Sequence, residues 1–276
     1  MTQSAVVQAP LWEPGLIHIG PGYCVGVSTD TRIPVALRRA MTLLADPPAE
    51  PDVGRGYLDL LSDAPSADEP ATNRGLFQAL WASGPGSMAY DTVQGLARRF
   101  AGSALTPISW LDLPPGGVAV DVGSGPGNVT AALADAAGAD GLALGVDISE
   151  AMLARAVRSE ASPAVGFIRA DAQRLPLREE VADAVVSLAA LQLIPDPAAA
   201  LGEMVRVLRV GGRLAVMVPT VSGTLAERFF RLLPDTGGAH FFTEDEVADI
   251  LEQHGLSRLR IRRYGPIQWT QGCKHE

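Results

Sequence analysis

Two apolar segments of this 276-residue chain end in acidic residues, and the first of them leads into a glycine-rich turn. Residues 118–128 alternate valine and alanine, reach Asp121, and then carry glycine at every second position from 123 to 127. Alternating small apolar residues suit a buried parallel strand, and glycines let a ligand approach backbone N–H groups without a Cβ in the way. A helix that begins near Asn128 would point its N-terminus at that ligand. The pattern predicts a strand, a turn and a helix around a nucleotide-like molecule.

The spacing of the glycines distinguishes two classes of ligand. Dinucleotide-binding loops read G-x-G-x-x-G and hold a diphosphate, whereas this loop reads G-x-G-x-G directly after Asp121. A carboxylate repels a diphosphate but suits a positively charged group, such as the ammonium of an amino acid. The second apolar segment, 141–147, ends in Asp147, where an acid can accept both hydroxyls of a ribose. An amino-acid end and a ribose together describe S-adenosylmethionine.

Ordered sequence blocks make the chain resemble the class I S-adenosylmethionine-dependent methyltransferases, in their type 11 group. The blocks are VDVGSGPG (120–127), GVDISEAML (145–153), IRADAQRLPL (168–177) and ADAVVSLAALQLIPDP (182–197), followed by RVLRVGGRLAV (206–216). Each block alone is weak, and their order and spacing carry the resemblance. It implies an α/β, Rossmann-like, doubly wound seven-stranded sheet that is mostly parallel with an antiparallel last strand, plus an N-terminal helical extension.

The resemblance also implies a cofactor site, residue by residue. Asp171 and Ala172 match the pair that holds the adenine amino group and the neighbouring ring nitrogen in the family, and Met152 would cover the adenine. Ser149 is a good N-cap for the helix that carries Met152. The residues expected to bind S-adenosylmethionine, or its product S-adenosylhomocysteine, are Asp121, Gly123, Ser124, Gly125, Gly127, Asp147, Ile148, Met152, Asp171, Ala172 and Leu188. No metal is expected.

The acceptor side offers weaker signals. Methyl transfer from a sulfonium needs mainly a nucleophile about 3 Å away and in line, with water excluded, and an acceptor of high pKa also needs a general base. Among the histidines, His240 is the candidate, because it follows the fifth strand, near the strand ends where ligands bind. His254 is expected to close a helix C-terminus instead. Gln192 ends the fourth strand, where relatives often have histidine, and glutamine can orient a substrate but cannot act as a base.

The region before the glycine loop has two interpretations. A helix is expected at 35–44, an acidic turn-rich loop at 61–70, and helices over 73–100. The helices over 73–100 either form a lid over the cofactor or pack against the sheet. Tyr90 lies where related chains place an aromatic residue near the cofactor, and its alternative role is a core tyrosine.

The C-terminal part is expected to finish the sheet. Residues 219–242 form an apolar-rich insertion that either walls a substrate pocket or completes the core. A helix from Thr243 to His254, opened by the capping box Thr243-x-x-Glu246, and strands at 256–263 and 266–271 follow. The expected domains are an N-terminal extension (1–70), a helical lid or flank (71–110) and a methyltransferase domain (111–276) with the 219–242 insertion.

Composition narrows the partners. A net charge of −9 argues against a nucleic-acid surface. The run Arg258, Arg260, Arg262, Arg263 alternates with apolar residues and is expected to be the solvent face of a late strand. Two cysteines, with no C-x-x-C pair, build no zinc ribbon. No apolar stretch of 18 residues and no leader-like start are present, which favours a cytoplasmic protein.

The expected function is methyl transfer to a small-molecule acceptor at an O, N or C atom, with a homodimer left open. Residues 56–61 and the later blocks also resemble uncharacterised bacterial and plastid methyltransferases related to the ribosomal-RNA guanine methyltransferases, whose zinc ribbon is missing here. Three alternatives stay open: an RNA methyltransferase without that ribbon, a nicotinamide oxidoreductase, and a non-catalytic relative that binds the cofactor or a partner. The loop spacing and Asp121 disfavour the nicotinamide enzyme.

Overall fold

The computed structural model describes residues 16–18, 24–26, 33–61, 108–220, 240, 242–265 and 267–275. The chain divides into two units, Met1–Ile33 and Pro34–Glu276. In the first unit, strands β1 (Leu16–His18) and β2 (Cys24–Gly26) pair in an antiparallel hairpin. Tyr90, the helices expected over 73–100 and most of the 219–242 insertion lie outside the described residues.

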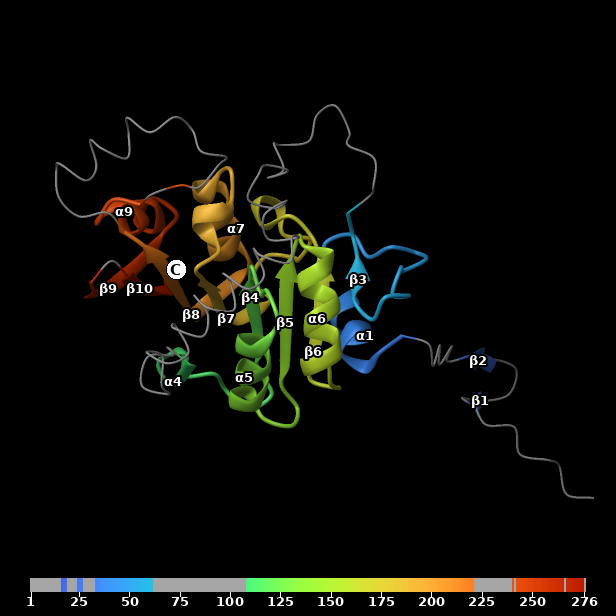
Figure 1. The fold of residues 1–276 in the computed structure, drawn as a ribbon. Helices are drawn as coiled ribbons and strands as arrows, with labels where there is room; N and C mark the ends of the chain where they lie inside the picture. The colour runs from blue at the N-terminus through green and yellow to red at the C-terminus, as the bar shows by residue number, and fades with distance from the viewer. Residues whose placement is uncertain are drawn as a thin grey trace, which may run out of the picture. The chain divides into compact units, whose positions relative to one another are not determined.

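An eight-stranded sheet forms the centre of the second unit (Figure 1), in the order β3-β6-β5-β4-β7-β8-β10-β9. Its strands are β3 (Leu58–Asp59), β4 (Val118–Val122), β5 (Leu142–Asp147), β6 (Val165–Arg169), β7 (Ala182–Leu188), β8 (Leu208–Pro219), β9 (Leu256–Tyr264) and β10 (Ile267–Lys274). The strands from β3 to β8 pair in parallel, and β10 runs antiparallel to both of its neighbours. This confirms the predicted fold class, a mostly parallel sheet with an antiparallel last strand.

The sheet has one strand more than the seven that were predicted. The additional strand is β3, which pairs in parallel with β6 at one edge of the sheet. Two residues are too few to give an alternating pattern of apolar and polar side chains, so the sequence carries no signal for this strand.

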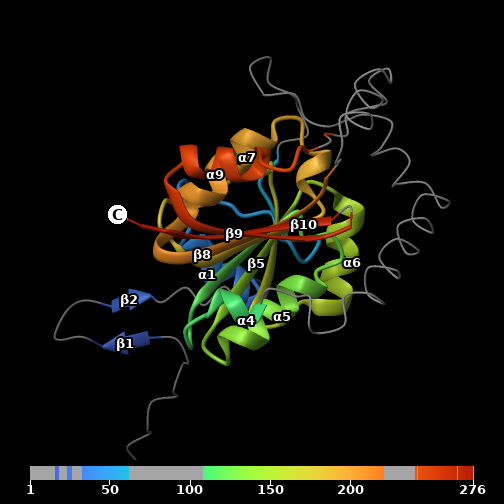
Figure 2. The same cartoon turned by 90° about the vertical axis from the view of Figure 1, so that its left-hand side faces the viewer.

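Helices cover both faces of the sheet (Figure 2). One face carries α4 (Ile108–Leu111), α5 (Asn128–Ala137) and α6 (Glu150–Glu160), and the other carries α1 (Val35–Met41), α7 (Pro197–Val207) and α9 (Glu246–Gln253). Short 3-10 turns, η1 (Ala172–Arg174) and η2 (Leu191–Leu193), follow β6 and β7. Among the described helices, none is long and apolar enough to cross a membrane.

The core under α5 and α6 explains part of the glycine pattern. Phe167 on β6 is fully buried between the sheet and these helices. A Cβ at Gly127 would lie 2.6 Å from the Phe167 ring, and one at Gly145 would lie 2.7 Å from it. The glycines therefore let the first helix pack closely on the sheet, in addition to any contact with a ligand.

The predicted starts of two helices are confirmed, and that of a third moves. Helix α5 begins at Asn128 as predicted, and the Ser149 hydroxyl accepts the Met152 N–H (3.4 Å) as the predicted N-cap of α6. Helix α9 begins at Glu246 rather than at Thr243. Half of the expected capping box is nevertheless present, because the Glu246 carboxylate accepts the Thr243 N–H (3.0 Å).

Candidate functional site

The glycine loop joins β4 to α5 at the carboxyl ends of the parallel strands. Gly123, Gly125 and Gly127 have φ angles of 73°, 51° and 85°, in the left-handed region that glycine adopts without strain. The N–H groups of Gly123 and Ser124 both donate to the Val146 carbonyl on β5, at 2.8 and 3.1 Å. The loop is thus anchored on the neighbouring strand, and its shape is set by the backbone.

Asp147 is held by backbone donors from both halves of the predicted site. Its two carboxylate oxygens accept the N–H groups of Gly125 and Ser149, each at 2.8 Å. Burial raises the pKa of Asp147, against the lowering effect of these hydrogen bonds. Each oxygen keeps a further lone pair, so the carboxylate can still accept hydroxyl groups of a ribose.

Asp121 lies below the loop and is 1% exposed. One of its oxygens accepts the Thr130 hydroxyl on α5, at 2.7 Å. Burial raises the pKa of Asp121 to about 7, although the Thr130 hydrogen bond opposes the shift, and the negative charge of Asp147 adds to it. Among the described residues no cation pairs with this carboxyl group, so a positively charged ligand group nearby would stabilise its ionised form.

The residues predicted to bind adenine follow β6, the strand next to β5, at the carboxyl ends of the parallel strands. Asp147 and Arg169 are register partners on β5 and β6, and Asp171 follows two residues later. The Asp171 carboxylate accepts the backbone N–H (2.9 Å) and the side-chain amide (3.0 Å) of Gln173. The strands themselves are buried, but the residues predicted to contact the cofactor at their carboxyl ends are half-buried, as Asp147 is. These residues are Ile148, Met152, Asp171, Ala172 and Leu188. Half-burial leaves each of them surface that a ligand can cover.

Two buried polar atoms near the loop have no protein partner. They are the Ser124 hydroxyl and the Gln192 side-chain oxygen. Buried polar atoms are nearly always hydrogen-bonded in native proteins, so each of these is a natural contact for a bound ligand or water. With the left-handed glycines and the carboxylate of Asp147, the Ser124 hydroxyl fits a cofactor that carries hydroxyl and ammonium donors, and the Gln192 oxygen is available to an acceptor.

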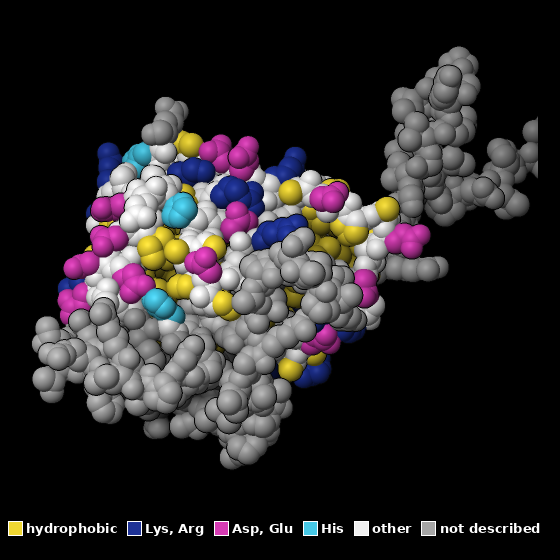
Figure 3. Space-filling view, turned by 90° about the horizontal axis from the view of Figure 1, so that it is seen from above, with side chains coloured by type: hydrophobic (Ala, Val, Ile, Leu, Met, Phe, Trp, Pro, Cys, Tyr) yellow, Lys and Arg dark blue, Asp and Glu magenta, His cyan; other side chains and the backbone are white. Residues whose placement is uncertain are grey.

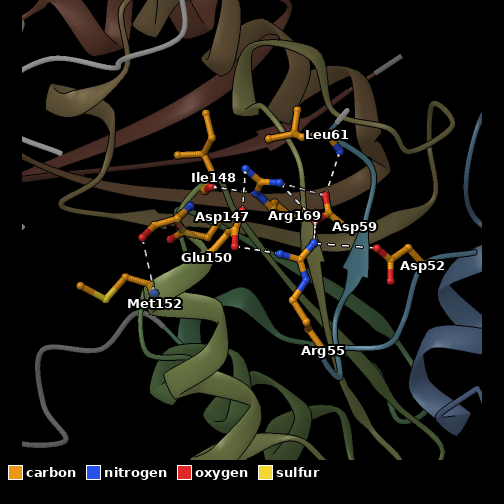
Figure 4. Close-up of polar contacts among 10 residues, drawn as sticks. Asp52, Arg55, Asp59, Leu61, Asp147, Ile148, Glu150, Met152 and Arg169 are labelled. Atoms are coloured by element: carbon orange, nitrogen blue, oxygen red, sulfur yellow. Dashed lines mark hydrogen bonds and ion pairs between the residues drawn. The ribbon is translucent and has the colours of Figure 1, made fainter. Parts of the chain in front are cut away.

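A cluster of charged residues beside Asp147 was not predicted from the sequence (Figure 4). Its members are Asp52, Arg55, Asp59, Glu150 and Arg169. The Arg169 guanidinium pairs with Asp59 (3.1 Å) and Glu150 (3.2 Å), and its Nε donates to the Ile148 carbonyl at 3.4 Å. Arg55 pairs with both Asp59 and Glu150.

This charged cluster joins three distant parts of the chain. The Asp59 side chain is 6% exposed and that of Arg169 15%, so their ion pair is largely desolvated and breaking it leaves a buried charge. The cluster ties residues 52–61 to the loop that follows Asp147. The phrase 56–61 was noticeable in the sequence, but the pairing of Asp59 with Arg169 spans 110 residues, which a sequence pattern does not reveal.

The acceptor-side predictions Gln192 and His240 are brought together. The His240 backbone N–H donates to the Gln192 carbonyl (2.7 Å), and the Gln192 amide donates to the Ala189 carbonyl (2.7 Å). The His240 Nε2 lies 2.5 Å from a Glu246 oxygen, and its ring packs edge-on against Phe242 at 4.6 Å between centroids. The His240 side chain is 38% exposed, so it stays accessible. Acidic, basic and apolar side chains are mixed over the described part of this end of the molecule (Figure 3).

Known proteins are similar to this chain in sequence and in fold. A family model described as a methyltransferase domain matches residues 120–216. The chain is 35% identical over 201 residues to a demethylmenaquinone methyltransferase of Roseiflexus castenholzii. The match covers 64% of this chain and 84% of that protein. It is 34% identical over 183 residues to a malonyl-[acyl-carrier protein] O-methyltransferase of Methylococcus capsulatus, which covers 64% of this chain and 65% of that protein.

A solved structure agrees on the fold alone. It is the complex between the Haloferax volcanii Trm112 methyltransferase activator and a methyltransferase, matched with a TM-score of 0.58 and 18% identity over 69% of this chain and 96% of that chain.

The chain belongs to the class I S-adenosylmethionine-dependent methyltransferases. The family model covers the chain from β4 to β8, which includes the glycine loop, Asp147 and Asp171. Two further curated relatives are matched over 43% and 44% of their own length, so the chain spans less than half of those proteins.

Proposed function

We propose that this protein transfers a methyl group from S-adenosylmethionine to a small-molecule acceptor by in-line displacement. The observation that carries the proposal is the hydrogen bond between the Gly125 N–H and Asp147. It joins the glycine turn and the ribose-type carboxylate in one site, on the fold of a methyltransferase family. The relatives support a small acceptor, because they are a demethylmenaquinone methyltransferase and a malonyl-[acyl-carrier protein] O-methyltransferase by name.

The proposed cofactor contacts combine the geometry of the glycine loop with the roles that the family resemblance implies. Asp147 would accept the ribose hydroxyls, and Asp121 would face the amino-acid end through the loop. Asp171 and Ala172 would bind the adenine, which Ile148, Met152 and Leu188 would flank. When bound, the cofactor supplies an electrophilic methyl group on a positively charged sulfur. We assign these roles to the methyltransferase domain proposed at 111–276.

We propose His240 as the general base for an acceptor that must lose a proton. The His240 Nε2 faces the Glu246 carboxylate, and in the neutral tautomer that carries its proton on Nε2 the lone pair on Nδ1 can take a proton. This is the same logic by which a carboxylate orients a catalytic histidine elsewhere. The hydrogen bond from the His240 backbone to the Gln192 carbonyl keeps this pair at the end of β7, where Gln192 would orient the acceptor.

The direct test is methyl transfer from labelled S-adenosylmethionine to three acceptors offered in parallel. These are a water-soluble hydroquinone, a malonyl thioester and a mixed RNA sample, each also incubated with an Asp147→Ala variant as the control. We expect label in a small acceptor with the unmodified protein and none with the variant. Label in RNA alone, or in nothing, would contradict the proposal.

A further inference from the structure

The hairpin formed by β9 and β10 concentrates positive charge and exposed apolar surface. The large hydrophobic residues that are exposed in the described part of the chain are Val35, Val210, Ile261, Tyr264 and Ile267, and the last three lie in this hairpin. Arg258, Arg260 and Arg262 are also exposed, and none forms an ion pair with another described residue. The hairpin therefore gathers three cations that lack a described ion-pair partner, in a chain whose net charge is −9.

Strand register places four of these side chains on one face. Tyr264 is the partner of Ile267 across the hairpin, and cross-strand partners point to the same side of a sheet. Arg260 and Arg262 precede Tyr264 at alternate positions and therefore share that side. We call Arg260, Arg262, Tyr264 and Ile267 the hairpin patch. Along β9 it presents two cations first and an apolar tip last.

The tip of the hairpin lies at the carboxyl ends of the parallel strands, as the candidate site does. Ile267 pairs with Pro219, the last residue of β8, and with Tyr264, so both lie level with the carboxyl end of that parallel strand. Strand β10 is two places from β7, which at about 4.8 Å per strand is roughly 10 Å from the strand that leads to Gln192. Figure 2 shows β9 and β10 side by side along this side of the sheet.

We propose that the hairpin patch docks the protein on an anionic lipid surface, from which a lipophilic acceptor reaches the site. The part of this proposal that concerns the acceptor rests on the proposed function, whereas the docking does not. Arginines hold anionic headgroups while their stems lie against apolar surface, and tyrosine is favoured at a membrane interface. The apolar tip can enter the boundary between headgroups and acyl chains, as amphipathic surface elements do.

Other occupants fit less well. A second copy paired along the edge strand β9 would bring like charges together. Charged side chains also guard edge strands against such pairing, but that role does not require an exposed Tyr264 and Ile267 at the tip. RNA would use the arginines and leave Ile267 without a function.

The test is sedimentation of the whole chain with vesicles of phosphatidylglycerol and phosphatidylcholine, and with pure phosphatidylcholine. We expect binding to the anionic vesicles only, weakened by salt. The double variant Arg260→Glu/Arg262→Glu should lose at least tenfold in binding, and Tyr264→Ser/Ile267→Ser should lose severalfold. The control Arg38→Glu/Arg158→Glu makes the same change in charge at exposed positions on α1 and α6, and should bind like the unmodified protein.

Two results would overturn the docking proposal: no binding to vesicles, with or without binding to an RNA oligonucleotide, or an equal loss in the Arg38/Arg158 control. Methylation of a water-soluble acceptor separates the two proposals. If the Arg260/Arg262 variant keeps that activity but loses vesicle binding and turnover of a vesicle-borne acceptor, both proposals hold. If no acceptor is methylated by any form of the protein while vesicle binding depends on the patch, only the proposed function fails.

Discussion

The two halves of the candidate site are held together in different ways. Around Asp147, backbone N–H groups of the glycine loop and of the α6 N-terminus set the geometry. Around His240, a backbone hydrogen bond to Gln192 fixes the chain, but the ring is oriented by a side-chain pair with Glu246. Backbone scaffolding suits a cofactor that many relatives share, whereas side-chain scaffolding can change with the acceptor. Substitutions in the two halves should therefore affect different steps.

The largest effect is expected at the carboxylate that joins the cofactor half. Asp147→Ala removes the acceptor of two ribose hydroxyls, and hydrogen bonds to a charged group contribute about 1.5–3 kcal/mol each. We expect the affinity for S-adenosylhomocysteine, measured by calorimetry, to fall at least about 100-fold. Asp135→Ala, at an exposed position on α5, should leave it unchanged. A loss below threefold for Asp147→Ala would mean that this carboxylate does not bind the cofactor.

In the cofactor half, the close packing of the glycine loop also leaves no room for a Cβ at Gly127. Gly127→Ala places a methyl 2.6 Å from the Phe167 ring at a φ of 85°, whereas Gly255→Ala has a φ of 86° and open space around it. We expect the free energy of unfolding to fall by about 2–4 kcal/mol for Gly127→Ala and by about 1 kcal/mol for Gly255→Ala. Urea denaturation of both variants measures the difference, and equal losses would show that packing against Phe167 is not what requires glycine.

The acceptor half should respond in rate rather than in cofactor affinity. His240→Ala should lower kcat about 100-fold, as expected when a general base is removed. The affinity for S-adenosylhomocysteine should stay the same, and added imidazole should restore part of the rate. Glu246→Gln should lower kcat less, because histidine remains. An unchanged kcat for His240→Ala would leave positioning alone as the source of catalysis.

The charged cluster is predicted to act on cofactor binding at a distance. Arg169→Gln releases the Ile148 carbonyl and the pairs with Asp59 and Glu150. We expect KM for S-adenosylmethionine to rise about tenfold while kcat at saturation changes little, because Asp147 is displaced but not lost. Arg213→Gln likewise breaks an ion pair, with Asp112, and releases a backbone carbonyl, that of Trp110, and it serves as the control for stability. A similar KM for the two variants would show that the cluster only stabilises the fold.

The smallest effect is a pH dependence from Asp121. Its pKa in the folded protein is raised to about 7, so between roughly pH 4 and 7 the folded state binds more protons than the unfolded state, and the free energy of unfolding falls as the pH rises. A cationic ligand group favours the ionised form of Asp121. Affinity for S-adenosylhomocysteine should therefore rise between pH 6 and pH 8, by up to about tenfold. Asp121→Asn should remove most of this dependence, and an unchanged dependence in that variant would assign it to another group.

The cofactor half was largely predictable because its signals are local. The strand, the three glycines and the start of α5 lie within a dozen residues, and the Ser149 cap lies two residues after Asp147. Each of these reports a backbone requirement that few residue types meet. The mostly parallel sheet with an antiparallel last strand followed from the family resemblance.

What could not be predicted depends on distant contacts. The pairing of Asp59 with Arg169 and the contact between His240 and Gln192 both form only when the sheet assembles. The short strand β3 exists because Leu58 finds a partner on β6, not because two residues favour a strand. The expected roles of Tyr90 and of the 219–242 insertion remain predictions.

The central claim is that the glycine loop and Asp147 form a site for S-adenosylmethionine. Its most direct test is calorimetric titration of the purified protein with S-adenosylhomocysteine, with NAD titrated into the same preparation. We predict tight binding of S-adenosylhomocysteine, its loss in Asp147→Ala, and no binding of NAD. Binding of NAD alone, or of neither ligand, would contradict the account.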